Sequence, residues 1–326
     1  RRVAGGPMAG YGGGAESPPA SPEFGPKAAG YGGSPVRRLR ALAAARAEDQ
    51  GVEGMSDQVV QSLLKACAVG DCDLKSSELT FAESTEARKP ILAPIGSGLA
   101  GAEQLQSLSL SFCASLSEVS GFGALGGLRT LKGCHLDFSA ARLRDVSALG
   151  AGLAGMERLE TLSLSLEKCA SLSELTGFEA LGGLKMLRDC QLNLSYATIR
   201  DVRSLGSGLG GMTQLERLSL NFGGCSALED MAGFEALGNL RMLKNCEIRL
   251  SHSNIQDVSG LGAGLGGMEQ LESLLLTFRG CSNLAGLAGL EALSCLKALK
   301  SCRLNFSYGK IQDVSALGAG LGGMER

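Results

Sequence analysis

The chain has 326 residues, a formal net charge of −2, 48 Gly, 11 Cys, 2 His and no Trp. The near-neutral charge argues against a dedicated nucleic-acid-binding protein, which normally carries a surplus of basic residues. No apolar run reaches the roughly 18 residues of a transmembrane helix, so we expect no membrane partner. Two His leave little material for His-based catalysis, and neither a catalytic group, a metal site nor a cofactor is predicted.

The first 94 residues divide into two parts. Residues 1–35 hold 10 Gly and 6 of the 8 Pro, and this composition predicts a disordered Gly/Pro-rich tail. Residues 36–94 are predicted to form a helical N-terminal segment, because apolar residues follow a helical stride between Val59 and Cys67. Within that segment, Leu79 and Phe81 indicate a degenerate first coil of the array that follows.

From Ile95 onward the sequence repeats itself. Similar phrases start at a constant interval, at Leu149, Leu205, Leu261 and Leu317, and the first copy, from Ile95, is two positions shorter. Each unit splits into two related halves, such as 149–177 and 178–204. In each half the apolar residues are first three or four positions apart and then two positions apart. These strides indicate a helical turn and a strand, each with one buried face. Stacked copies must therefore share a core, and strands are predicted at 108–112, 134–138, 162–166, 190–194, 218–222, 246–250, 274–278 and 302–306.

The half-repeats carry the pattern L-x-x-L-x-L-x-L-x-x-C-x-x-L-x-[DE]-[LV]. This pattern resembles the leucine-rich repeat family and is closest to its cysteine-containing subtype, here in tandem 56-residue double repeats. The resemblance covers residues 95–326 and implies an α/β fold, a right-handed solenoid or horseshoe with a parallel β-sheet on its concave face. The chain stops early in a fifth unit, so we expect the solenoid to be truncated inside its last repeat.

Two recurring motifs are explained by the repeat. The motif G-x-G-x-x-G occurs ahead of a predicted strand, whereas a dinucleotide-binding turn would follow one; its copies are Gly96–Gly101, Gly150–Gly155, Gly206–Gly211 and Gly262–Gly267. We expect these glycines to let neighbouring coils pack closely. Eight of the 11 Cys stand in two ladders at the repeat period, without the C-x-x-C spacing of zinc sites. Buried free thiols and an odd total favour a reduced, cytoplasmic protein.

An acidic column accompanies the repeat. Asp or Glu occupies one slot of nearly every half-repeat, at Glu118, Asp145, Glu174, Asp201, Asp230, Asp257 and Asp313. Each carboxylate is expected to accept backbone N–H groups at the start of the next outer turn. The alternative is that stacked carboxylates supply oxygen ligands to Ca²⁺.

The outward strand positions form the concave face, which the resemblance makes the expected binding surface. Ser and Asn dominate this face, and it lacks the Trp, Tyr and clustered Arg that anchor most tight interfaces. The candidate partner-binding residues are His135, Asp137, Gln191, Asn193, Glu247, Arg249, Leu275, Arg303 and Asn305, and the charged C-terminal end is the favoured contact patch.

The resemblance implies a non-catalytic protein–protein interaction scaffold that presents a curved surface to a protein partner. Two alternatives remain open. One is a regulatory or substrate-recognition domain of a larger enzyme, such as a kinase or a ubiquitin-ligase receptor, and the other is a structural spacer. Because the last coil would lack a cap, we also expect end-to-end self-association through its apolar face.

Overall fold

The computed structural model describes residues 76–80, 105–112, 114 and 116–324, all of which belong to one unit of the chain, Arg37–Arg326. The expectations for the tail at 1–35 and for most of 36–94 lie outside these residues. Phe81 and the cysteines Cys67, Cys72 and Cys113 also lie outside them.

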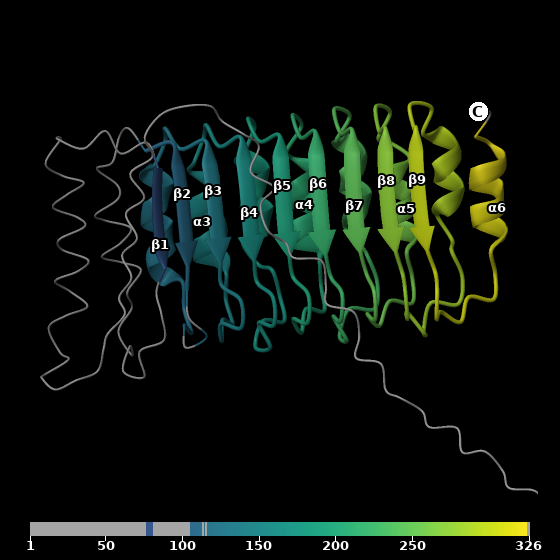
Figure 1. Cartoon of the computed structure of the whole chain (residues 1–326), viewed down its shortest axis with the longest axis horizontal. Helices are drawn as coiled ribbons and strands as arrows, with labels where there is room; N and C mark the ends of the chain where they lie inside the picture. The colour runs from purple at the N-terminus through teal and green to yellow at the C-terminus, as the bar shows by residue number, and fades with distance from the viewer. Residues whose placement is uncertain (1–75, 81–104, 113, 115, 325–326) are drawn as a thin grey trace, which may run out of the picture. The chain divides into compact units, whose positions relative to one another are not determined.

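Nine parallel strands form one sheet across the described residues, and each strand pairs with its neighbour in the sequence (Figure 1). The strands are β1 (Ser76–Thr80), β2 (Ser107–Ser111), β3 (Gly133–Asp137), β4 (Thr161–Ser165), β5 (Asp189–Asn193), β6 (Arg217–Asn221), β7 (Asn245–Arg249), β8 (Ser273–Thr277) and β9 (Ser301–Asn305). The predicted strands are confirmed, each one residue earlier than expected. The last residue predicted for each strand, such as Phe138, instead begins the turn, where its N–H donates to the Ser165 carbonyl of the next coil at 2.9 Å.

The segments that return from one strand to the next alternate between two kinds of helix and cover one face of the sheet (Figure 1). The 3₁₀ helices follow the even-numbered strands and are η1 (Ser120–Gly127), η2 (Phe178–Gly183), η3 (Phe234–Asn239) and η4 (Leu290–Cys295). The α-helices follow the odd-numbered strands from β3 and are α3 (Ser147–Ala154), α4 (Arg203–Gly210), α5 (Ser259–Leu265) and α6 (Ser315–Gly322).

Four members of the acidic column cap the α-helices. Asp145, Asp201, Asp257 and Asp313 each accept the N–H of the first residue of an α-helix through Oδ1 at 2.8 Å. The hydroxyl and backbone N–H of Ser315 also lower the pKa of Asp313. A carboxylate at this end of a helix faces unpaired N–H groups and the positive end of the helix dipole. The capping prediction is therefore confirmed at these four positions.

The recurring glycines lie where the backbones of neighbouring coils meet, as the sequence indicated. A Cβ built on Gly155 of the α3 return would lie 2.7 Å from the Cα and carbonyl oxygen of Gly126 in the preceding coil. A Cβ on Gly150, on the opposite side of α3, would collide with the carbonyl group of Gly177 in the following coil. The helices α3, α4 and α5 are thus each packed between two 3₁₀ segments, whereas α6 contacts η4 alone among the described elements. This close backbone contact explains the G-x-G-x-x-G motif.

The core is a stack of identical slots filled mostly by Leu. On the interior strands the second and fourth residues are buried, for example Leu162 and Leu164 at 1% and 2% exposure. One cysteine ladder supplies weak donors: the thiols of Cys169, Cys225 and Cys281 donate to backbone carbonyls of the preceding coil at 3.0–3.3 Å. The strand cysteines behave as small apolar residues.

The coil that contains β9 leaves its apolar slots uncovered in the described residues. Cys302 is exposed and Leu304 is half-buried, although the equivalent positions in β5, Cys190 and Leu192, are buried. Beyond β9, Val314 and Leu321 are 57% and 44% exposed. No helix within the described part of the chain has both the length and the hydropathy needed to cross a bilayer.

Candidate functional site

The face of the sheet opposite the helices carries two straight rows of side chains. Parallel register places equivalent residues of adjacent strands opposite each other, at the roughly 4.8 Å spacing of a sheet. The first row runs His135, Ser163, Gln191, Ser219, Glu247, Leu275 and Arg303. The second row runs Asp137, Ser165, Asn193, Asn221, Arg249, Thr277 and Asn305. Every residue predicted for the site therefore lies in one of these two rows.

The rows divide the predicted residues into three groups. His135 and Asp137 share β3, and Gln191 and Asn193 share β5. The remaining candidates lie together on three adjacent strands, because Glu247 and Arg249 are on β7, Leu275 is on β8, and Arg303 and Asn305 are on β9. Since β4 and β6 separate the groups, only the last one forms a continuous candidate surface.

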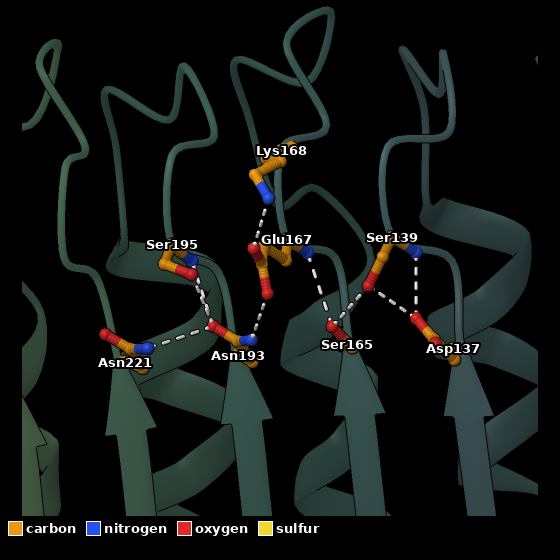
Figure 2. A network of polar contacts seen from close by, with 8 residues as sticks. All are labelled: Asp137, Ser139, Ser165, Glu167, Lys168, Asn193, Ser195 and Asn221. Atoms are coloured by element: carbon orange, nitrogen blue, oxygen red, sulfur yellow. Dashed lines mark hydrogen bonds and ion pairs between the residues drawn. The ribbon is translucent and has the colours of Figure 1, made fainter. Parts of the chain in front are cut away.

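A hydrogen-bond network occupies the polar groups at the carboxyl ends of β3 to β6 (Figure 2). At its centre, Asn193 donates to Glu167 Oε2 at 3.1 Å and accepts from Asn221 Nδ2 at 3.1 Å. The Asn193 Oδ1 atom also accepts from the hydroxyl of Ser195 at 2.8 Å. The second oxygen of Glu167 binds Lys168 Nζ at 2.9 Å, and this interaction raises the pKa of Lys168.

The network continues toward β3 through Ser165. The Ser165 hydroxyl lies 3.4 Å from the Glu167 N–H, which donates to it, and 2.9 Å from the Ser139 hydroxyl. Asp137 in turn accepts from the N–H and the hydroxyl of Ser139 at 2.9 Å and 2.5 Å. These donors and acceptors form hydrogen bonds with each other across four coils. Most polar groups in this half of the face therefore already have partners within the protein.

The C-terminal part of the face is arranged differently. Glu247 and Arg249, two residues apart on β7, form an ion pair and are each 30% exposed at the side chain. Leu275 lies directly between Glu247 and Arg303 in the register, and it is half-buried on the open face. Arg303 and Asn305 are both exposed. The result is an apolar side chain with a carboxylate on one neighbouring strand and a guanidinium group on the other.

Sequence reasoning missed two residues beside this surface. The guanidinium carbon of Arg279, in the turn after β8, lies 5.0 Å from the ring centroid of Tyr308. This distance is within the range of a cation–π interaction. Tyr308 is 77% exposed, in the turn after β9. The alternation of buried and open-face residues applies only within a strand, so it did not predict a role for either residue. A signal was nevertheless present in the sequence, because Tyr196, His252 and Tyr308 occupy the same slot of successive double repeats.

A second missed feature is an alternating row of charges immediately before the strands, which we call the edge ladder. It consists of Lys132, Glu160, Arg188, Glu216, Lys244, Glu272 and Lys300. Glu216 contacts both Arg188 and Lys244 at 3.1 Å, and the hydrogen bond from Lys244 is the main cause of its lowered pKa. Lys132 pairs with Glu160 at 3.0 Å, and Lys300 pairs with Glu272 at 2.9 Å. The alternation of sign from one half-repeat to the next is visible in the sequence itself.

The described residues offer little for catalysis or metal binding. His135 lies on β3 and His252 follows β7, so the structure does not bring them together. No group of three or more His, Cys, Asp or Glu in the described ranges is placed to hold a metal ion. Burial raises the pKa of the Cys134 and Cys246 thiols to about 12, which disfavours the reactive thiolate.

Comparisons with known proteins give matches among solved structures. No protein-family model matches the chain, and no curated protein does. An internalin C2 from Listeria monocytogenes is 22% identical with a TM-score of 0.41, and the match covers 64% of this chain and 74% of that one. The leucine-rich repeat domain of the type III effector XopL is 18% identical with a TM-score of 0.42, covering 78% and 75%. A TLR13–ssRNA13 complex is 19% identical with a TM-score of 0.45, covering 80% of this chain and 36% of that one.

The fold class itself rests on the structure described above. One strand and one helical return recur with each half-repeat, the strands form a single parallel sheet, and Leu fills the buried slots. This is the α/β architecture of a leucine-rich repeat solenoid, and it confirms the predicted fold class.

Proposed function

We propose that this protein is a non-catalytic interaction scaffold that presents the open face of its sheet to a protein partner. The observation that carries the proposal is the surface on β7 to β9, where a half-buried Leu275 lies between charged side chains of neighbouring strands. Apolar area ringed by polar groups is the usual composition of a protein–protein contact. Rigid hydrogen-bonded strands hold these side chains in place, so binding costs little backbone entropy.

We further propose that the array belongs to the cysteine-containing subtype of leucine-rich repeats and is built from 56-residue double repeats. Three observations support this proposal. The α-helical returns start at Ser147, Arg203, Ser259 and Ser315, once in every double repeat. The thiol–carbonyl hydrogen bonds recur at the same interval. The edge ladder changes sign from one half-repeat to the next.

We also place the protein in a reducing compartment such as the cytoplasm. Support comes from the eight described cysteines, which are all free thiols, six of them buried. A buried thiol that fills a core slot would have to leave it to form an intermolecular disulfide. Intact-mass analysis of the native protein from cells, before and after alkylation, tests this proposal: disulfides among these eight cysteines would contradict it.

The experiment for the scaffold function is an affinity capture with matched charge-reversal variants. The face variant combines Arg249→Glu and Arg303→Glu, and the control variant combines Arg158→Glu and Arg241→Glu, which are exposed outside the sheet. The two variants have the same net charge. We expect quantitative mass spectrometry to identify a protein that the wild type and the control retain and the face variant loses. If no protein shows this dependence, or if only the control loses its partners, the scaffold function on this face is refuted.

A further inference from the structure

The charges on the open face are distributed unevenly along the sheet. The turns and strand positions from β3 to β6 carry three carboxylates against two cations, namely Asp137, Glu167 and Asp189 against Lys168 and Arg217. The corresponding positions from β7 to β9 carry one carboxylate, Glu247, against the three guanidinium groups of Arg249, Arg279 and Arg303. The face therefore changes from slightly acidic to basic along its length.

The basic section also has cations without acidic partners. Arg249 is paired with Glu247 on the same strand. In contrast, neither Arg279 nor Arg303 forms an ion pair with any carboxylate of the described residues. An exposed guanidinium offers five N–H donors in a fixed planar arrangement that matches a carboxylate. These two side chains are thus available to an anionic group from a partner.

The geometry around the two cations adds an apolar contact and some rigidity. Leu275 lies directly opposite Arg303 in the strand register. Arg279 is four residues beyond Leu275, and its guanidinium lies over the Tyr308 ring, which favours this position before binding. At roughly 3.3 Å per residue, four residues of extended chain span about 13 Å. Because Arg279 lies in the turn after β8, this length is an upper limit for its separation from Leu275. An extended peptide with two acidic residues four positions apart is therefore long enough to reach both cations.

We propose that this surface, which we call the β7–β9 patch (Arg249, Leu275, Arg279, Arg303 and Tyr308), binds an extended acidic peptide segment. In the complex, one carboxylate pairs with Arg303 and a second with Arg279, while apolar groups of the peptide pack on Leu275 and the exposed Tyr308 ring. The inference rests on the proposed scaffold function and gives its partner a chemistry. Nucleic acid is a poorer match, because tight phosphate-backbone binding uses many more cations than the patch offers.

The test is a binding titration of the full chain with two synthetic peptides, followed by fluorescence anisotropy. The probe is Gly-Asp-Leu-Val-Leu-Asp-Gly with an N-terminal dye, and its control has Asn in place of both Asp. We expect the acidic peptide to bind more tightly than the amide control, by about tenfold or more, since hydrogen bonds to charged groups are the stronger ones. Its affinity should fall as salt is added.

Single substitutions locate the site. Arg279→Gln and Arg303→Gln should each weaken binding of the acidic peptide about five- to tenfold, whereas Arg241→Gln, an exposed side chain away from the sheet face, should leave it unchanged. Unchanged circular dichroism and melting temperature show that each variant is folded. Equal affinity for the two peptides, or equal effects of the three substitutions, would overturn the inference.

Two further outcomes separate this inference from the scaffold function. If affinity capture finds a face-dependent partner but the acidic peptide does not bind at millimolar concentration, the scaffold stands and the acidic-peptide assignment fails. A single-stranded oligonucleotide that binds more tightly than the peptide, and is lost with Arg279→Gln and Arg303→Gln, would also overturn the peptide assignment. Loss of both peptide binding and face-dependent capture would remove both proposals.

Discussion

Gly206 of α4 provides a sharp test of how the coils pack. Its Cα faces the following coil, and a Cβ built there would lie 2.6 Å from the carbonyl carbon of Gly233 and nearer still to the carbonyl oxygen. Both groups are backbone atoms, so neither can rotate away as a side chain would. Gly318 occupies the same slot of α6, and a Cβ built on it meets nothing within 4 Å. The two positions differ only in their surroundings.

The expected change in the free energy of unfolding for each substitution results from two opposing effects, backbone entropy and packing. Gly→Ala inside a helix normally stabilises a protein by about 0.5–1 kcal/mol, because Gly loses more backbone entropy on folding. Forcing an extra methyl group into a packed contact costs about 1–3 kcal/mol. We therefore expect Gly206→Ala to destabilise the protein by a net ~1–2 kcal/mol and Gly318→Ala to stabilise it by up to ~1 kcal/mol. At about 2–4 °C per kcal/mol, Gly206→Ala should lower the melting temperature by roughly 2–8 °C.

The assay is thermal and urea unfolding of the two single variants beside the wild type, followed by far-ultraviolet circular dichroism. The decisive result is the opposite sign of the two effects. If Gly206→Ala is as stable as the wild type or more stable, the returns of neighbouring coils are not in backbone contact. The account of the G-x-G-x-x-G motif would then be wrong.

Three other substitutions or treatments test separate parts of the structure. The lowered pKa of Glu216 means that its stabilisation is present above its ordinary pKa and lost as the pH falls through the folded value, so Glu216→Gln should lower the melting temperature at pH 7, and this loss should shrink as the pH falls below about 4. A maleimide should label the exposed Cys295 in the native protein, whereas Cys190, whose pKa is raised by burial, should react only after denaturation. Peptide mapping of the labelled protein measures both, and labelling of Cys190 before denaturation would contradict its burial. The wild type should self-associate end to end with a second copy at rising concentration, and Val314→Lys with Leu321→Glu should make it monomeric in light scattering; a monomeric wild type would refute this interface.

Much of the fold follows from the sequence, because each half-repeat encodes its structure locally. The stride of two places strands within one residue of their observed positions, as for β5 at Asp189–Asn193 against a prediction of 190–194. The Asp of each α-helical return caps a helix that begins two residues later, so a local motif is enough to predict the contact. Alternation also predicts correctly which side chains point to the open face, including His135 and Arg303.

The tertiary structure decided which of those side chains have partners. Asn193 and Glu167 bind each other across 26 residues, and Glu216 binds Arg188 and Lys244 across 28 residues in each direction. Such pairs depend on the register between coils and on side-chain rotamers, which no single repeat encodes. The same holds for Arg279, whose contact with Tyr308 belongs to the turns after the strands, beyond the reach of the alternation rule. A chain of near-neutral composition thus also has a basic surface, because stacking brings together on three strands the few cations that the sequence spreads over three half-repeats.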